Sequence, residues 1–335
     1  CSKYYVVECK SGNTWYKGDM FMCSGCPTGA GAHPSTILQT FRMPEPVKGE
    51  LEIRFRPTGK EKADTAAVEN AVPEIIMPKS YLAEYVQYLG NAVPKDTLNV
   101  LCVGNSFTYY WGCPAMLKEI AWNEGHYLRV KSTLKGGQTF GDHLALPVSR
   151  NVVNAGRYDY AFFQDQSQSP ARYASDTTQF DYVNTNFLKL TDRLLSRSRN
   201  CRVILESTWS FEKDDFGGFG SHAAFDSLMT IGTSMMVRNA SKIFGANDFE
   251  VSPIGRAFSI VRNENPGIDL YSADSKHQSD YGSYLKACVN YLMIFRKPFQ
   301  SQPADGATSS IDCSIPHDQA VYLRQVAERV VLGAR

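Results

Sequence analysis

Ser106 is the first candidate for chemistry, because it follows an apolar stretch at residues 98–103 that is typical of a buried strand. Gly104 permits a tight exit from such a strand. The amide N–H groups of a helix that starts there point back toward the serine. This arrangement suits an exposed nucleophile with an oxyanion donor beside it. A serine here also suits a helix N-cap with no chemical role, and Ser106 alone does not separate the two interpretations.

Asp274 and His277 are the second candidate pair, with D-x-x-H spacing on a predicted loop. Imidazole has a pKa suited to removing a serine proton near neutrality. A carboxylate three residues away can hold the ring tautomer and stabilise the imidazolium that forms. Of the six histidines, only His277 has a carboxylate at this spacing. The pattern predicts a Ser106–His277–Asp274 catalytic triad; the alternative is a surface pair with no serine partner.

An alternation of strands and helices from residue 97 onward must bring these residues together. Apolar runs predict strands at residues 98–103, 127–133, 158–163, 202–206 and 249–253. Helical periodicity covers residues 114–123, 182–195, 223–244, 281–295 and 319–331. Such alternation implies a parallel sheet with helices on both faces, whose ligands bind at the carboxyl ends of the strands. Ser106, Gln164 and the turn after residue 206 are therefore expected on one rim.

Two sequence blocks resemble those of the SGNH/GDSL hydrolase superfamily. Residues 104–108, Gly-Asn-Ser-Phe-Thr, are similar to the first block, where Asp more often precedes the serine, and Asp274-x-x-His277 is similar to the last. The glycine pair at residues 136–137 resembles the block whose backbone N–H serves the oxyanion hole. The resemblance implies a serine nucleophile, with the backbone N–H groups of Ser106 and Gly137 as oxyanion donors.

The third block departs from the family pattern. Where the family usually has G-x-N-D with an asparagine donor, residues 164–167 are Gln-Asp-Gln-Ser. This run resembles the Q-G-E-S motif of carbohydrate acetylesterases. The resemblance therefore implies Gln164 as the side-chain oxyanion donor, with Gln166 as the alternative. With Thr208-Trp209 and residues 253–255, the spacing is similar to an SGNH-like branch common in gut Bacteroidetes.

The same resemblance implies an α/β fold for residues 97–335: a flavodoxin-like three-layer sandwich with a central parallel sheet. Residues 1–96 have a different texture, with short alternating runs at residues 4–9 and 50–56 typical of half-exposed strands. We expect two parts, a small β-rich N-terminal region of unknown role and an SGNH-like hydrolase domain. The resemblance predicts a function for residues 97–335 and none for residues 1–96.

Aromatic side chains near the rim suggest the substrate class. Trp111 follows the serine and Trp209 follows the fourth predicted strand, so both are candidates to stack on sugar rings. The loop at residues 214–220 is a candidate lid. We expect a serine esterase that removes acetyl or other small ester groups from carbohydrate through an acyl-enzyme. The alternatives are a non-catalytic glycan-binding protein on the same scaffold and an esterase of lipids or small molecules.

Composition narrows the class of partner. The 335 residues carry 35 Lys+Arg against 34 Asp+Glu, and neither a basic excess nor a basic run points to nucleic acid. The sequence contains no stretch of about 18 uncharged apolar residues, so it predicts no transmembrane span. No P-loop or G-x-G-x-x-G follows a strand, and we expect neither a cofactor nor a metal.

Nine cysteines contribute two further expectations. Cys1 resembles the lipid-carrying first residue of a mature bacterial lipoprotein, which predicts a secreted or cell-envelope protein with a possible lipid anchor. The alternative is an incidental chain boundary. Cys23 and Cys26 form a lone C-x-x-C for which disulfide or incidental, metal-binding and redox interpretations all stay open.

Overall fold

The computed structural model of the chain describes residues 2–24, 52–57, 96–213, 217–245, 249–303 and 315–333. Cys1, the C-x-x-C side chains and the first part of the predicted lid, residues 214–216, lie outside the residues so described. Among the described residues, no helix is both long and apolar enough to cross a membrane.

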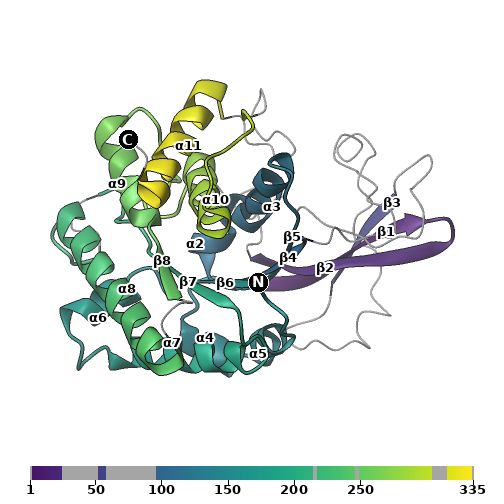
Figure 1. The fold of residues 1–335 in the computed structure, drawn as a ribbon, viewed down its shortest axis with the longest axis horizontal. Coiled ribbons are helices and arrows are strands. Elements are labelled where there is room, and N and C mark those ends of the chain that lie inside the picture. The colour runs from purple at the N-terminus through teal and green to yellow at the C-terminus, as the bar shows by residue number, and fades with distance from the viewer. Residues whose placement is uncertain are drawn as a thin grey trace.

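A five-stranded parallel sheet forms the centre of the molecule, in the order β5-β4-β6-β7-β8 (Figure 1). Its strands are β4 (Leu98–Gly104), β5 (Leu128–Leu134), β6 (Tyr160–Phe163), β7 (Arg202–Glu206) and β8 (Phe249–Ser252). Each matches a strand predicted from the sequence to within about two residues at either end. β4 lies between β5 and β6, so the polypeptide reverses its direction of travel across the sheet beside β4, where α/β sheets bind ligands.

Helices cover both faces of this sheet (Figure 1). One face carries α3 (Cys113–Asn123), α9 (Ile254–Glu264), α10 (Asp280–Phe295) and α11 (His317–Leu332). The other carries α4 (Phe140–Ala145), α5 (Pro147–Asn154), α7 (Asp181–Leu195) and α8 (His222–Phe244), with α6 (Ser169–Ser175) packed on α8. The predicted three-layer α/β sandwich is confirmed. Helices α4, α5, α6 and α9 were not predicted.

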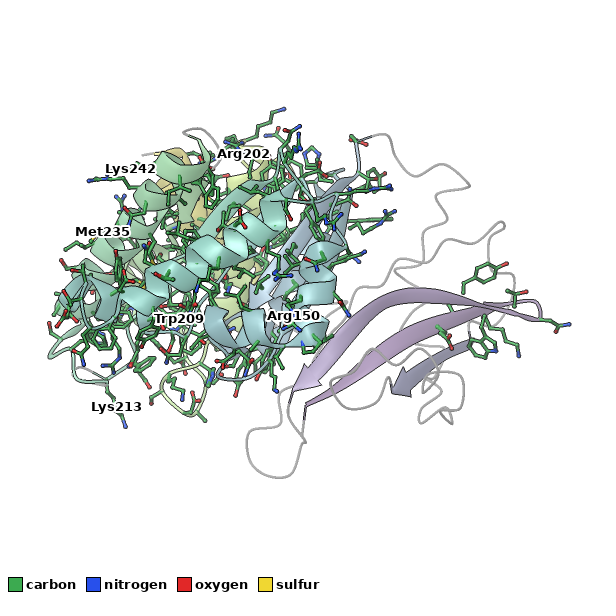
Figure 2. All side chains as sticks on the ribbon, turned by 90° about the horizontal axis from the view of Figure 1, so that it is seen from below. Arg150, Arg202, Trp209, Lys213, Met235 and Lys242 are labelled. Atoms are coloured by element: carbon green, nitrogen blue, oxygen red, sulfur yellow. The ribbon has the colours of Figure 1, made fainter. Side chains whose placement is uncertain are left out.

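Alternation along β4 shows how the two cores form. Val100 and Cys102 point into the core beneath α3 and α10, whereas Leu101 and Val103 point into the core beneath α7. All four side chains are buried because helices cover both faces. Charged side chains such as Lys213 and Lys242 project from the outer surface instead (Figure 2).

The N-terminal region forms a separate antiparallel sheet in the order β2-β1-β3. It consists of β1 (Ser2–Ser11), β2 (Thr14–Ser24) and β3 (Glu52–Pro57). Strand β2 contacts β5, the edge strand of the parallel sheet, and the hairpin extends outward from there (Figure 1). The small β-rich region is thus present as predicted, while a domain division at residue 96 stays a prediction.

Gly232 provides a test of the packing between α8 and α6. A Cβ at this position would lie 1.8 Å from the carbonyl oxygen of Pro170, so the two helices approach as closely as only glycine permits. We expect Gly232→Ala to destabilise the protein by about 2 kcal/mol in urea unfolding, although alanine is the better helix former. Ser234→Ala, at an exposed position of the same helix, should stay within about 0.5 kcal/mol of wild type. Equal stability of the two variants would contradict this packing.

Candidate active site

Ser106 lies at the carboxyl end of β4, as the first residue of the four-residue helix α2 (Ser106–Tyr109). Asn105 caps this helix, and its side-chain oxygen accepts from the backbone N–H of Phe107 at 3.1 Å. A Cβ on Gly104 would lie 2.7 Å from Thr108 Oγ1 and 2.8 Å from Gln164 Oε1. Glycine is therefore required at this turn for lack of space.

The structure brings the three predicted triad residues together. Nε2 of His277 lies 2.7 Å from Oγ of Ser106, across a sequence separation of 171 residues. Nδ1 of the same ring is hydrogen-bonded to Oδ2 of Asp274. The other carboxylate oxygen, Oδ1, accepts from the backbone N–H groups of His277 at 2.9 Å and Lys276 at 3.1 Å. The loop thus fixes the carboxylate and the carboxylate orients the ring, which leaves Nε2 to act on the serine.

Electrostatics favour the ionised form of Asp274. Partial burial opposes ionisation of this carboxyl, but hydrogen bonds from the ring and backbone of His277 outweigh it, so the pKa of Asp274 lies below its ordinary value. A carboxylate anion beside Nδ1 stabilises the imidazolium that forms when Nε2 takes a proton.

Two aromatic rings enclose the imidazole. Tyr110 stacks on His277 with ring centroids 4.1 Å apart and planes 13° from parallel. Phe107 lies on another side, at 5.1 Å between centroids. Both rings restrict rotation of His277 away from Ser106. The residue that follows, Trp111, adopts a left-handed conformation with φ of +53° and lies half-buried against the α10 side of the core. Its predicted contact with substrate stays a prediction.

The predicted backbone donors lie on adjacent turns. Gly137 is exposed and occupies the turn that follows β5, with φ of +69°. Asn105 ties this turn to the nucleophile: its Nδ2 donates to the carbonyl of Gln138 at 3.0 Å and to that of Asp165 at 3.3 Å. One amide therefore joins the ends of β4, β5 and β6 around Ser106.

The prediction that Gln164 is an oxyanion donor is wrong. Its side chain is fully buried, and Oε1 accepts from the backbone N–H of Asn105 and from Oγ1 of Thr108, both at 3.0 Å. Its Nε2 donates to the carbonyl of Asp165. Gln164 thus supports the nucleophile turn from inside. Gln166, the alternative, is half-buried, and its Nε2 lies 3.3 Å from Ser167 Oγ in its own loop.

The prediction that Trp209 stacks on substrate is also wrong. Its side chain is 1% exposed and lies between Phe107, at 4.8 Å between ring centroids, and Phe258, at 4.2 Å. Its indole N–H donates to the carbonyl of Lys276 at 3.1 Å. Because Phe107 follows the nucleophile and Lys276 precedes the base, Trp209 joins the two halves of the site from within the core.

His143 is a site residue that sequence reasoning missed. One ring nitrogen, Nε2, lies 3.0 Å from the carbonyl of Gly104, and the other lies 3.0 Å from Oγ of Ser149. Burial lowers the pKa of His143 to about 4, so the ring is neutral at pH 7. A neutral ring that donates from Nε2 must accept at Nδ1. In the sequence, His143 is marked only by its neighbour Asp142, and an adjacent Asp-His pair does not predict a buried histidine.

Comparison with known proteins supports the fold. No protein-family model matches the chain, and no curated protein matches it. A DUF4886 family protein from Bacteroides uniformis superposes with a TM-score of 0.53 at 17% identity, over 71% of this chain and 95% of that one. Axe2, an acetylxylan esterase from Geobacillus stearothermophilus, gives a TM-score of 0.43 at 13% identity, over 58% and 94%. A lipase from a goat rumen metagenome gives 0.40 at 14%, over 58% and 96%. The chain shares its α/β fold with the DUF4886 family protein, which agrees with the three-layer sandwich that the sequence predicted.

Asp165 gives the site region a pH-dependent stability. Its buried carboxyl accepts from the backbone N–H of Phe140 at 2.9 Å and of Gln166 at 2.8 Å. Burial outweighs these two hydrogen bonds and raises the pKa of Asp165 to about 7. In the unfolded chain the same carboxyl ionises near pH 4 (about its ordinary value). Between these values only the folded state holds the proton, so the contribution of Asp165 to stability falls as pH rises.

We therefore expect Asp165→Asn to gain stability relative to wild type as pH rises. Asparagine keeps a carbonyl oxygen that can accept from the two N–H groups, and it cannot ionise. The variant therefore does not lose unfolding free energy as pH rises in the way that wild type does. Urea unfolding of both proteins at roughly pH 4.5, 6 and 8 measures the difference in unfolding free energy. The difference should grow up to about pH 7 and then level off. A difference that is constant with pH would show that this carboxyl does not change its ionisation on folding.

Proposed function

We propose that the protein is a serine esterase. The observation that carries this proposal is the 2.7 Å contact between Ser106 Oγ and His277 Nε2, in a ring whose other nitrogen is held by Asp274. Nucleophile, base and orienting carboxylate are each within hydrogen-bond reach of the next, as acyl transfer requires. Because Ser106 stands at the carboxyl end of a central strand, an ester can approach it from the rim of the sheet.

The reaction follows from the positions of these atoms. Oγ of Ser106 attacks the ester carbonyl carbon while its proton passes to Nε2 of His277. The tetrahedral intermediate collapses, the imidazolium gives that proton to the departing alcohol oxygen, and an acyl-serine remains. A water molecule then attacks the acyl carbon with His277 again as base, which releases the carboxylic acid and restores the serine. Asp274 stabilises the imidazolium in both halves of the reaction.

The negative charge of the tetrahedral intermediate needs donors opposite the base. We assign the backbone N–H groups of Ser106, at the start of α2, and of Gly137, on the neighbouring turn. Gln166 is the remaining candidate for a side-chain donor, because Gln164 is buried and its Oε1 accepts hydrogen bonds from Asn105 and Thr108. Each such donor contributes on the order of 3 kcal/mol to the stability of the transition state.

We further propose that the substrate is a small ester, such as acetyl, on a carbohydrate. Tyr109, Tyr110 and Trp111 follow the nucleophile as a row of half-buried rings, and rings at a site rim suit the apolar faces of sugars. Tyr110 stacks on His277, which places one of these rings beside the base. The near-neutral charge of the chain agrees with an uncharged ester.

Replacement of the nucleophile tests the enzymatic role. We expect Ser106→Ala to abolish hydrolysis of an aryl acetate and covalent labelling by a fluorophosphonate probe, because no oxygen remains to form the acyl or phosphonyl bond. Ser234→Ala, on the exposed face of α8, should keep both. Folded wild-type protein that neither hydrolyses the acetate nor takes the label would instead favour a non-catalytic glycan-binding protein.

A panel of esters tests the substrate class. We expect acetylated polysaccharides to release acetate, and p-nitrophenyl acetate to be hydrolysed with a kcat/KM at least about tenfold above that of the octanoate, because the proposed substrate carries a small acyl group. Acetate and methanol release from acetylated and methyl-esterified polysaccharides are measured side by side. Preference for octanoate would favour a lipid esterase, and methanol release would favour a methyl esterase.

A further inference from the structure

A buried ion pair lies beneath the helix that carries Ser106. Glu206 ends β7 and Lys286 lies in α10, and both side chains are only 1% exposed. Oε2 of the glutamate lies 2.7 Å from Nζ of the lysine. A charge pair removed from water costs free energy unless further hydrogen bonds satisfy it. The partners of these two side chains therefore indicate what the pair is for.

Besides its bond to Glu206, Lys286 donates two hydrogen bonds to the helix that carries Ser106. An ammonium group has three protons, and here Nζ has three acceptors: Glu206 Oε2, the backbone carbonyl of Phe107 at 2.8 Å and Oγ1 of Thr108 at 3.1 Å. Two of these three acceptors belong to the residues that directly follow Ser106. A positive charge at the carboxyl-terminal end of α2 is also favourable for the helix dipole.

The same network reaches the residue before Ser106. The Thr108 hydroxyl donates to Gln164 Oε1 at 3.0 Å, and this oxygen also accepts from the backbone N–H of Asn105 at 3.0 Å. Both chain neighbours of Ser106 are thus held by one buried chain of hydrogen bonds. A four-residue helix has too few internal bonds to hold its own geometry, so its position depends on such contacts.

The far end of the network is anchored in the sheet. Asn290, one turn after Lys286 in α10, donates to Glu206 Oε1 at 2.6 Å and accepts from the Ser252 hydroxyl at 2.9 Å. Ser252 closes β8, and Glu206 closes β7. The hydrogen bonds therefore connect the turn that carries Ser106 to the ends of β7 and β8 as well as to its own strand, β4.

We infer that Glu206 and Lys286 are positioning residues that set the orientation of Ser106 and of its backbone N–H. The inference rests on the proposed esterase function. Loss of the pair should lower kcat, because the serine and its oxyanion donor shift relative to His277. It should change KM little, because neither side chain reaches the rim where substrate binds.

Single and double variants separate this role from a purely structural one. Glu206→Gln and Lys286→Met each leave a buried charge unpaired, and both should lower Tm and kcat. The double variant Glu206→Gln/Lys286→Met has no buried charge to leave unpaired, so most of the Tm loss should be recovered. We expect its kcat for aryl acetate to stay at least about tenfold below wild type, with KM within about threefold.

A second buried ion pair, far from the site, serves as the control. Arg324 and Glu124 are 5% and 1% exposed and join at 3.5 Å, with contacts to α10 and Ser301 instead of α2. Glu124→Gln should lower Tm as the single variants do but leave kcat unchanged. If the Glu206→Gln/Lys286→Met variant regains wild-type kcat together with Tm, the pair is structural only and the inference is overturned.

Thr108→Val keeps the inference testable if the double variant does not fold. It removes one hydroxyl, leaves the ion pair in place, and breaks the link from Lys286 to Gln164. We expect kcat to fall with KM unchanged, and unaltered kcat would overturn the inference. Wild-type protein is assayed beside each variant: wild type inactive on aryl acetate defeats the esterase proposal itself, whereas active wild type with equally active variants defeats only the positioning role.

Discussion

The hydrogen bond between Ser106 and His277 is the contact on which the rest of the site depends. It joins residues 171 positions apart, one at the end of a strand and one on the loop before α10. A proton can pass only at a separation of about 3 Å, so small displacements of either segment stop the reaction. The surrounding structure must therefore hold two independent segments in register.

Two sets of contacts, one apolar and one polar, hold these segments in place. One is apolar: Trp209 packs between Phe107 and Phe258, and its indole N–H, which donates to the carbonyl of Lys276, fixes the chain beside the base. The other is polar and runs from the Glu206–Lys286 pair to the backbone on both sides of the serine. Dispersion contacts hold distance with little directional preference, whereas hydrogen bonds hold direction. Together they restrain both.

Much of this arrangement could be predicted from sequence, but only up to a definite point. Strand alternation located the five parallel strands, and the rule that ligands bind at carboxyl ends put Ser106, Gln164 and the turn after residue 206 on one rim. The D-x-x-H spacing separately paired Asp274 with His277. Side-chain direction was not accessible in the same way. Gln164 and Trp209 both follow strands at that rim, yet both point inward, Gln164 onto Asn105 and Thr108 and Trp209 between two buried phenylalanine rings. The role of Lys286 could not be predicted either, because it is a single charged residue within the apolar stretch of α10.

The inward direction of these residues has a consequence for how specificity can change in this fold. Residues that support the triad are nearly all below 10% exposed, so substitution there risks stability along with activity. Tyr109, Tyr110 and Trp111, by contrast, are half-buried. Tyr110 also stacks on the ring of His277, so under the proposed function a change there alters the orientation of the base as well.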